Sequence, residues 1–119
     1  MPVEQLISQL FAARDIAHRL HLKTRSFAQH VALGDLYEQL LDLADTLAEV
    51  YQGKYGVMNI PMPQSGFNEM DSVSFVCDLS TWAESARSAI NPADTNLLNE
   101  WDNVLSSIYR AKYKLQNLA

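Results

Sequence analysis

The chain has 119 residues, of which 48% are hydrophobic and 19% charged, and fourteen acidic against nine basic residues give a formal charge of −5. This length suits one domain with a sizeable core, and the balanced composition excludes a disordered or low-complexity protein. The negative charge disfavours nucleic-acid binding through the overall field of the molecule, because phosphates would be repelled.

The start of the chain and its single cysteine indicate a compartment. The residues after Met1 lack the basic start and apolar run of a signal peptide, and no stretch approaches the ~18–20 apolar residues of a membrane span. Cys77 excludes an internal disulfide and a zinc ribbon, and its apolar neighbours predict a buried, inert thiol. We therefore expect a soluble, cytoplasmic protein without a membrane partner.

The first half of the chain predicts two helices. Apolar residues recur every three or four positions from about Val3 to Leu22 and again from about Phe27 to Gly53. The polar residues 23–26 form the turn between these helices, and Gly53 and Gly56 are stop signals for the second.

A long crossover separates these helices from the next pair. The segment Val57–Phe67 holds Pro61 and Pro63, which excludes a helix there. About ten extended residues can span roughly 33 Å, the length of a helix of ~22 residues. The crossover can therefore run the length of a bundle, which would leave the second and third helices parallel.

Two further helices complete the predicted fold. The third is predicted from about Asn68 to Ile90, and the fourth from near Pro92 to the end of the chain, with Asp94 in its first turn. No strand pattern competes with these helices. The sequence therefore predicts an all-α, four-helix bundle of ferritin-like connectivity, with residues 1–119 as a single domain.

Four side chains have the chemistry of metal ligands: His21, His30, Asp45 and Glu49. Asp45 and Glu49 are four residues apart on one helical face and could hold one cation together. His30 precedes Asp45 by fifteen residues, about 22 Å along a helix. One subunit cannot bring these groups to one ion, whereas a partner packed antiparallel along the second helix could.

Less specific interpretations of the same residues stay open. Asp45 and Glu49 continue a stripe with Glu38 and Asp42, and acidic stripes are usually solvated faces. The Glu-x-x-His signature of di-iron bundles is absent, and Asp15-x-x-His18 is its nearest approach.

The stretch AHRLHLKTRSFAQH at residues 17–30, followed by LADTLAE at residues 43–49, resembles the Dps branch of the ferritin-like superfamily. It resembles more closely small ferritin-like proteins encoded by bacteriophages. The resemblance implies a ferroxidase site between subunits that oxidises ferrous iron with peroxide. His21 and His30 would come from one subunit and Asp45 and Glu49 from its partner, in the cytoplasm of a phage host.

Two positions depart from the Dps pattern. Gly34 replaces an acid four residues after the second histidine, and the shorter spacing between the histidines leaves His18 as an alternative ligand to His21. The basic N-terminal tail of many Dps proteins is missing too, and the crossover is short and Pro-rich. We therefore expect at least a homodimer rather than a Dps shell.

A non-enzymatic protein that uses the bundle as a scaffold to bind a host protein is the alternative function. Exposed apolar residues of Val57–Phe67, or Tyr109 and Tyr113, would contact that partner. DNA binding through Lys23 and Arg25 is disfavoured by the charge of the chain. Trp82 and Trp101 lie on helical stripes and are predicted to be core residues, not ligand platforms.

Overall fold

Helices form all the regular structure of the protein. The computed structural model describes residues 1–119. Its helices are α1 (Val3–Lys23), α2 (Phe27–Tyr55), α3 (Ser72–Ala86), a single 3₁₀ turn η1 (Arg87–Ala89) and α4 (Thr95–Asn117). None of them combines the length and the hydrophobicity that a membrane-spanning helix needs.

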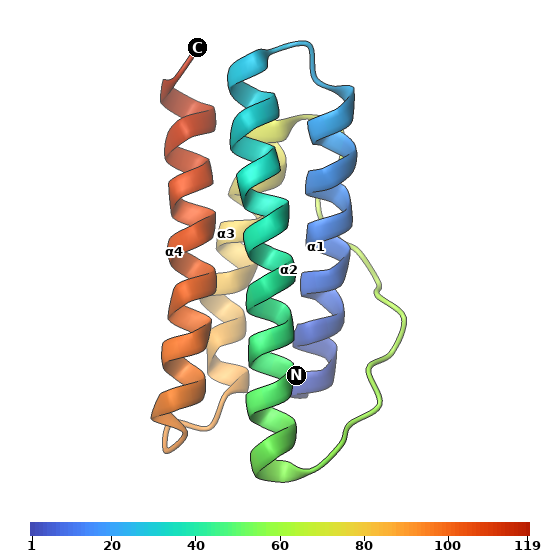
Figure 1. Cartoon of the computed structure of the whole chain (residues 1–119), viewed down its shortest axis with the longest axis vertical. Helices are drawn as coiled ribbons and strands as arrows, with labels where there is room; N and C mark the ends of the chain where they lie inside the picture. The colour runs from blue at the N-terminus through green and yellow to red at the C-terminus, as the bar shows by residue number, and fades with distance from the viewer.

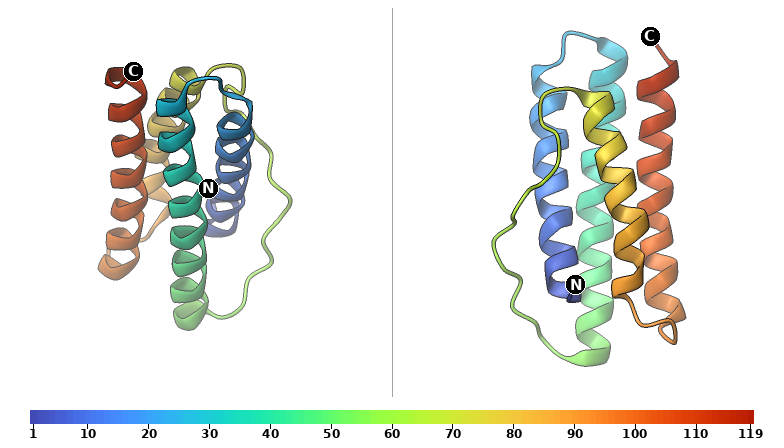
Figure 2. Two further views of the ribbon diagram at one scale, coloured as in Figure 1. Left: turned by 45° about the horizontal axis from the view of Figure 1, so that its top comes forward. Right: turned by 180° about the vertical axis from the view of Figure 1, so that it is seen from behind.

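The helices form a four-helix bundle in which α2 and α3 run in the same direction, as predicted (Figure 1). In the order of their contacts, α1 packs beside α2, α2 beside α4, and α4 beside α3. Residues 56–71 leave the lower end of α2, pass outside α1 and enter the upper end of α3 (Figures 1 and 2). We call this segment the crossover.

The start of α3 and the end of α2 differ from their predicted positions by a few residues. Helix α3 begins at Ser72 and not near Asn68, because Asp71 accepts a hydrogen bond from the Ser74 N–H at 3.0 Å and so caps the first turn. Helix α2 continues through Gly53 to Tyr55 and is ended by Gly56, whose φ of +94° glycine can adopt without the steric cost that a Cβ atom would add.

Trp101 lies in the core, as predicted, whereas Trp82 is only half-buried and packs against the core from its edge. Trp101 is fully buried, and its Nε1–H donates a hydrogen bond to the Ala83 carbonyl at 2.9 Å. Trp82 packs edge-on against Trp101, with ring centroids 5.6 Å apart, and against Phe67 at 5.5 Å. Phe67 is itself buried and therefore fixes the end of the crossover to the bundle.

The prediction of a buried thiol at Cys77 is wrong. Its side chain is only half-buried, and Sγ lies 3.6 Å from Nε2 of Gln116 on α4. The neighbouring Val76, about 100° away around the helix, faces the core instead.

Asp94 joins the end of α2 to the start of α4. Its side chain is 3% exposed and accepts hydrogen bonds from the Lys54 ammonium and the Tyr55 hydroxyl. The hydrogen bond from Lys54, followed by that from Tyr55, holds the pKa of Asp94 below its usual range. The sequence predicts Asp94 in the first turn of the fourth helix, but it precedes α4 as its N-cap residue. Its carboxylate bonds to α2 and makes no capping hydrogen bond to α4.

Acid should unfold the protein partly through Asp94. A carboxyl group with a lowered folded-state pKa contributes stability above its unfolded value of about 3.9, and this is lost as the pH falls through the folded pKa. The Asp94→Asn variant should therefore be less stable at neutral pH and lose less stability on going below about pH 4. Urea unfolding from neutral pH to pH 3 checks this, with the exposed Asp42→Asn as the control. Parallel pH curves for Asp94→Asn and wild type would contradict it.

Candidate metal site on the α1–α2 face

The side chains of His21 and His30 lie against each other across the turn between α1 and α2, and we call this pair of residues the histidine clasp. Their rings stack with centroids 3.7 Å apart and an interplanar angle of 17°. The Nδ1–H of His21 donates a hydrogen bond to the His30 carbonyl at 2.6 Å, and the Nδ1–H of His30 donates one to the His21 carbonyl at 2.8 Å. The structure thus brings these two predicted ligands together.

This reciprocal arrangement fixes which ring nitrogens are available. A carbonyl oxygen only accepts hydrogen bonds, so both Nδ1 atoms carry hydrogens, and a neutral ring then holds its lone pair on Nε2. Histidines that bind metals commonly donate their other N–H to a backbone carbonyl in this way. The His21 carbonyl lies in the last turn of α1, where carbonyl oxygens have no partner within the helix. The hydrogen bond from His30 satisfies this one.

Gly34 provides the space that the His21 ring occupies. A Cβ atom at Gly34 would lie 3.0 Å from Cε1 and 3.1 Å from Nδ1 of His21. The ring cannot retreat easily, because the His30 ring lies against it. Alanine at position 34 would therefore force the His21 ring to shift by a few tenths of an ångström against the His30 ring.

Replacing Gly34 by alanine should disturb the clasp. In a helix interior Gly→Ala normally gains about 1 kcal/mol, and Gly53→Ala in α2, where nothing lies within 4 Å, should show that gain. Gly34→Ala should gain less or lose stability and should shift the imidazole resonances of His21 and His30. Urea unfolding and side-chain NMR of both variants check this. Equal stabilisation with unchanged histidine spectra would contradict the role of Gly34.

Beside the histidine clasp lies a second cluster of side chains, formed by Arg14, His18 and Tyr37, which the sequence did not predict. His18 stacks on Tyr37 with centroids 4.2 Å apart, and the Arg14 guanidinium lies 5.3 Å from the centre of the same tyrosine ring. The Arg14 Nε is buried without a hydrogen-bond partner. Of the two candidate first ligands, His21 lies against His30 and His18 against Tyr37. Arg14, His18 and His21 are spaced four and three residues apart, so they share one face of α1, and this spacing could have predicted the cluster.

Asp45 and Glu49 are exposed on the outer face of α2, together with Glu38 and Asp42. Asp45 lies about 22 Å and Glu49 about 28 Å along α2 from His30. Nowhere in the chain do three His, Cys, Asp or Glu side chains gather as a metal site would need. The structure therefore does not bring the predicted acids to the predicted histidines within one copy.

The residues predicted for a protein partner are partly accessible. Tyr109 is 43% and Tyr113 59% exposed, but the Tyr109 hydroxyl donates a hydrogen bond to Glu84 at 2.7 Å. In the crossover, Val57 and Met62 are exposed, whereas Phe67 is buried.

Comparison with known proteins gives relatives but no assigned activity. An uncharacterized 14.6 kDa protein in the mobD-ri intergenic region of Enterobacteria phage T4 is 26% identical over 113 residues, which cover 94% of this chain and 86% of that protein. No solved structure shows a significant match to the chain. Residues 21–115 match a family of unknown function, DUF5856. This match covers both histidines of the clasp, both acids of α2 and most of α4, and the chain therefore belongs to the family DUF5856.

Proposed function

We propose that this protein is a ferritin-like bundle that binds ferrous iron, or another divalent metal ion, at a site shared by two copies of the chain. His21 and His30 of one copy and Asp45 and Glu49 of the other hold the ion. The reciprocal hydrogen bonds of the histidine clasp carry this proposal, because they fix both Nδ1 atoms and leave both Nε2 atoms free for a metal.

An antiparallel pair along α2 satisfies the spacing. The point midway between His30 and the Asp45–Glu49 pair lies near Glu38, so a two-fold axis there places each clasp opposite the acids of the other copy. The distribution of charged side chains along this face also favours an antiparallel pair. Lys23 and Arg25 lie at the histidine end of the face, and the acidic residues lie toward its other end.

The same face carries groups that a second copy would cover. Leu22 and Phe27 are 69% and 81% exposed beside the clasp, and Val31 and Leu41 are 43% and 40% exposed further along α2. Phe27 and Val31 are one helical turn apart on α2, and a second copy along this face would remove both from water. Arg14, at the level of Tyr37, would lie near the proposed axis, where acidic residues of the second copy could pair with it.

Imidazole nitrogens with carboxylate oxygens suit first-row transition metals such as iron. Ferrous iron would be the substrate of any oxidation here, with peroxide as the oxidant that the resemblance to Dps proteins implies. The residues of the chain bind and orient the ion, and Gly34 and the backbone carbonyls keep the histidine rings in place.

Anaerobic calorimetric titration with ferrous iron tests the proposal. Wild type should bind about one ion per chain, as two-fold symmetry gives each copy one site, and Asp45→Ala/Glu49→Ala should bind none. Glu69→Ala/Glu100→Ala removes the same charge away from α2 and the proposed axis and should retain binding. Equal binding by wild type and the Asp45/Glu49 variant would overturn the proposed site.

A further inference from the structure

Arg14 is a cation that the fold holds in place without supplying an anion. Its guanidinium lies 5.3 Å from the centre of the Tyr37 ring, and its Nε is enclosed by the protein without a hydrogen-bond partner. None of the four ion pairs of the chain includes Arg14, and the neighbouring Asp15 pairs with Arg19 at 2.7 Å instead. Since a partly buried cation without a counter-charge is unfavourable, an anion from outside the chain would stabilise it.

Other hydrogen-bond donors beside Arg14 have no partner within the chain either. The terminal nitrogens of Arg14 make no hydrogen bond and, unlike Nε, are not enclosed. His18 stacks on the Tyr37 ring with centroids 4.2 Å apart, and neither its imidazole nor the Tyr37 hydroxyl bonds another group of the protein. These polar atoms are not enclosed, so a ligand from solvent can reach them.

The Tyr37 ring fixes the positions of the two groups from α1. Arg14 and His18 are four residues apart, so they lie on one face of α1, and both rest against the same tyrosine of α2. A guanidinium near an aromatic ring is attracted by its electrons. Because these donors are already ordered, a ligand that binds them does not pay to immobilise them.

We propose that Arg14, His18 and Tyr37 bind a small oxyanion of the phosphate type at the surface between α1 and α2. The planar guanidinium presents parallel N–H groups that bind two oxygens at once. The imidazole N–H and the tyrosine O–H can donate to further oxygens, which a tetrahedral anion offers. Since the net charge of −5 repels phosphate, binding depends on local donors such as these.

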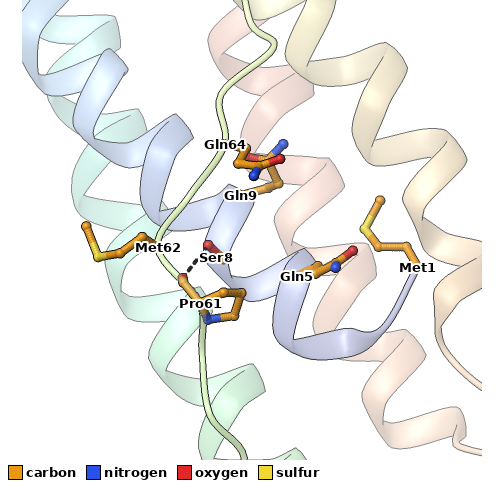
Figure 3. Close-up of a pocket in the computed structure, with 7 residues that line it drawn as sticks. All are labelled: Met1, Gln5, Ser8, Gln9, Pro61, Met62 and Gln64. Atoms are coloured by element: carbon orange, nitrogen blue, oxygen red, sulfur yellow. Dashed lines mark hydrogen bonds between the residues drawn. The ribbon is translucent and has the colours of Figure 1, made fainter.

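The groove between α1 and the crossover is a poorer candidate for this ligand (Figure 3). It has a volume of about 210 Å³, and the Ser8 hydroxyl donates a hydrogen bond to the Pro61 carbonyl there at 2.7 Å. Its only cation is the terminal amine of Met1, and its polar side chains are mainly glutamines. The side-chain amide of Gln64 in this groove can therefore serve as an internal reference.

Titration of the metal-free protein with inorganic phosphate, at constant ionic strength, tests the inference by calorimetry and NMR. Wild type should bind phosphate with shifts of the His18 and Tyr37 ring resonances and an unchanged Gln64 amide. Acetate, with one planar carboxylate, should bind more weakly than phosphate. None of the four proposed metal ligands takes part, so failure of the metal site leaves this result unaffected.

Variants at Arg14 separate the guanidinium from a general effect of charge. Arg14→Gln should bind phosphate at least about tenfold more weakly than wild type, because it removes a charged, paired donor. Arg14→Lys keeps the charge but not the planar group and should also bind more weakly. The control Arg25→Gln removes the same charge from an exposed side chain and should bind like wild type.

Two outcomes would overturn the inference. One is that wild type binds no phosphate; if Arg14→Gln then also weakens self-association in sedimentation, the cluster belongs to a contact between two copies instead. The other is that Arg14→Gln and Arg14→Lys bind phosphate as tightly as wild type. Circular dichroism checks the fold of both variants, and if Arg14→Gln does not fold, the result for Arg14→Lys decides.

Discussion

A one-to-one mixture of two variants that bind no metal by themselves should recover about a quarter of the wild-type metal capacity, because each site needs one residue set from each copy. The first variant is His21→Ala/His30→Ala and the second is Asp45→Ala/Glu49→Ala. After unfolding and joint refolding, random assortment makes about half of the dimers mixed. Each mixed dimer then has one intact site, formed by the histidines of the second variant and the acids of the first.

The other site of the mixed dimer lacks both ligand sets. A site built within one chain could not be restored by mixing, because no chain in the mixture would carry all four residues. Calorimetric titration of the mixture against each variant alone measures the recovery. Zero recovery from refolded, dimeric protein would contradict a site between subunits.

Trp101→Ala should cause the largest loss of stability of any single replacement proposed for this chain, about 3–5 kcal/mol. Trp101 is fully buried and contacts Trp82, and its ring N–H donates a hydrogen bond to the Ala83 carbonyl. The replacement therefore leaves a large cavity. Since small domains have a total stability of about 5–15 kcal/mol, the variant would be close to unfolding.

Two further variants separate the contributions to this loss. Trp101→Phe keeps most of the ring but removes the hydrogen bond, and should cost less than Trp101→Ala. Trp82→Ala, at a half-buried position, should also cost less. Urea unfolding followed by far-ultraviolet circular dichroism gives each free energy of unfolding. A loss in Trp101→Ala no larger than in Trp82→Ala would contradict the greater contribution of the fully buried Trp101 to the core.

The direction of the helices could be predicted because it depends on local features. The apolar periodicity identified four helices, and Pro61 and Pro63 in a long segment required a crossover that leaves α2 and α3 parallel. The start of α3 could not be placed well. The Asp71 cap moves it to Ser72, and helix ends depend on such individual hydrogen bonds.

The candidate site could be predicted only in part. Spacing predicted His21, His30 and the two acids as ligands shared by two copies, and of this the structure shows that the two histidines lie together. It could not predict that each histidine would bond the other's carbonyl, or that Gly34 would leave room for the His21 ring. Those features arise from the packing of α1 on α2.

Disulfide formation at the proposed two-fold axis is the most direct test of the central claim, that two copies pair antiparallel along α2. Glu38→Cys in a Cys77→Ser background should form a covalent dimer under mild oxidation, because the two new thiols would meet at the axis. Thr81→Cys, on the exposed side of α3, should stay monomeric on denaturing gels. No covalent dimer at position 38, or an equal yield at position 81, would contradict the pairing on which the shared metal site depends.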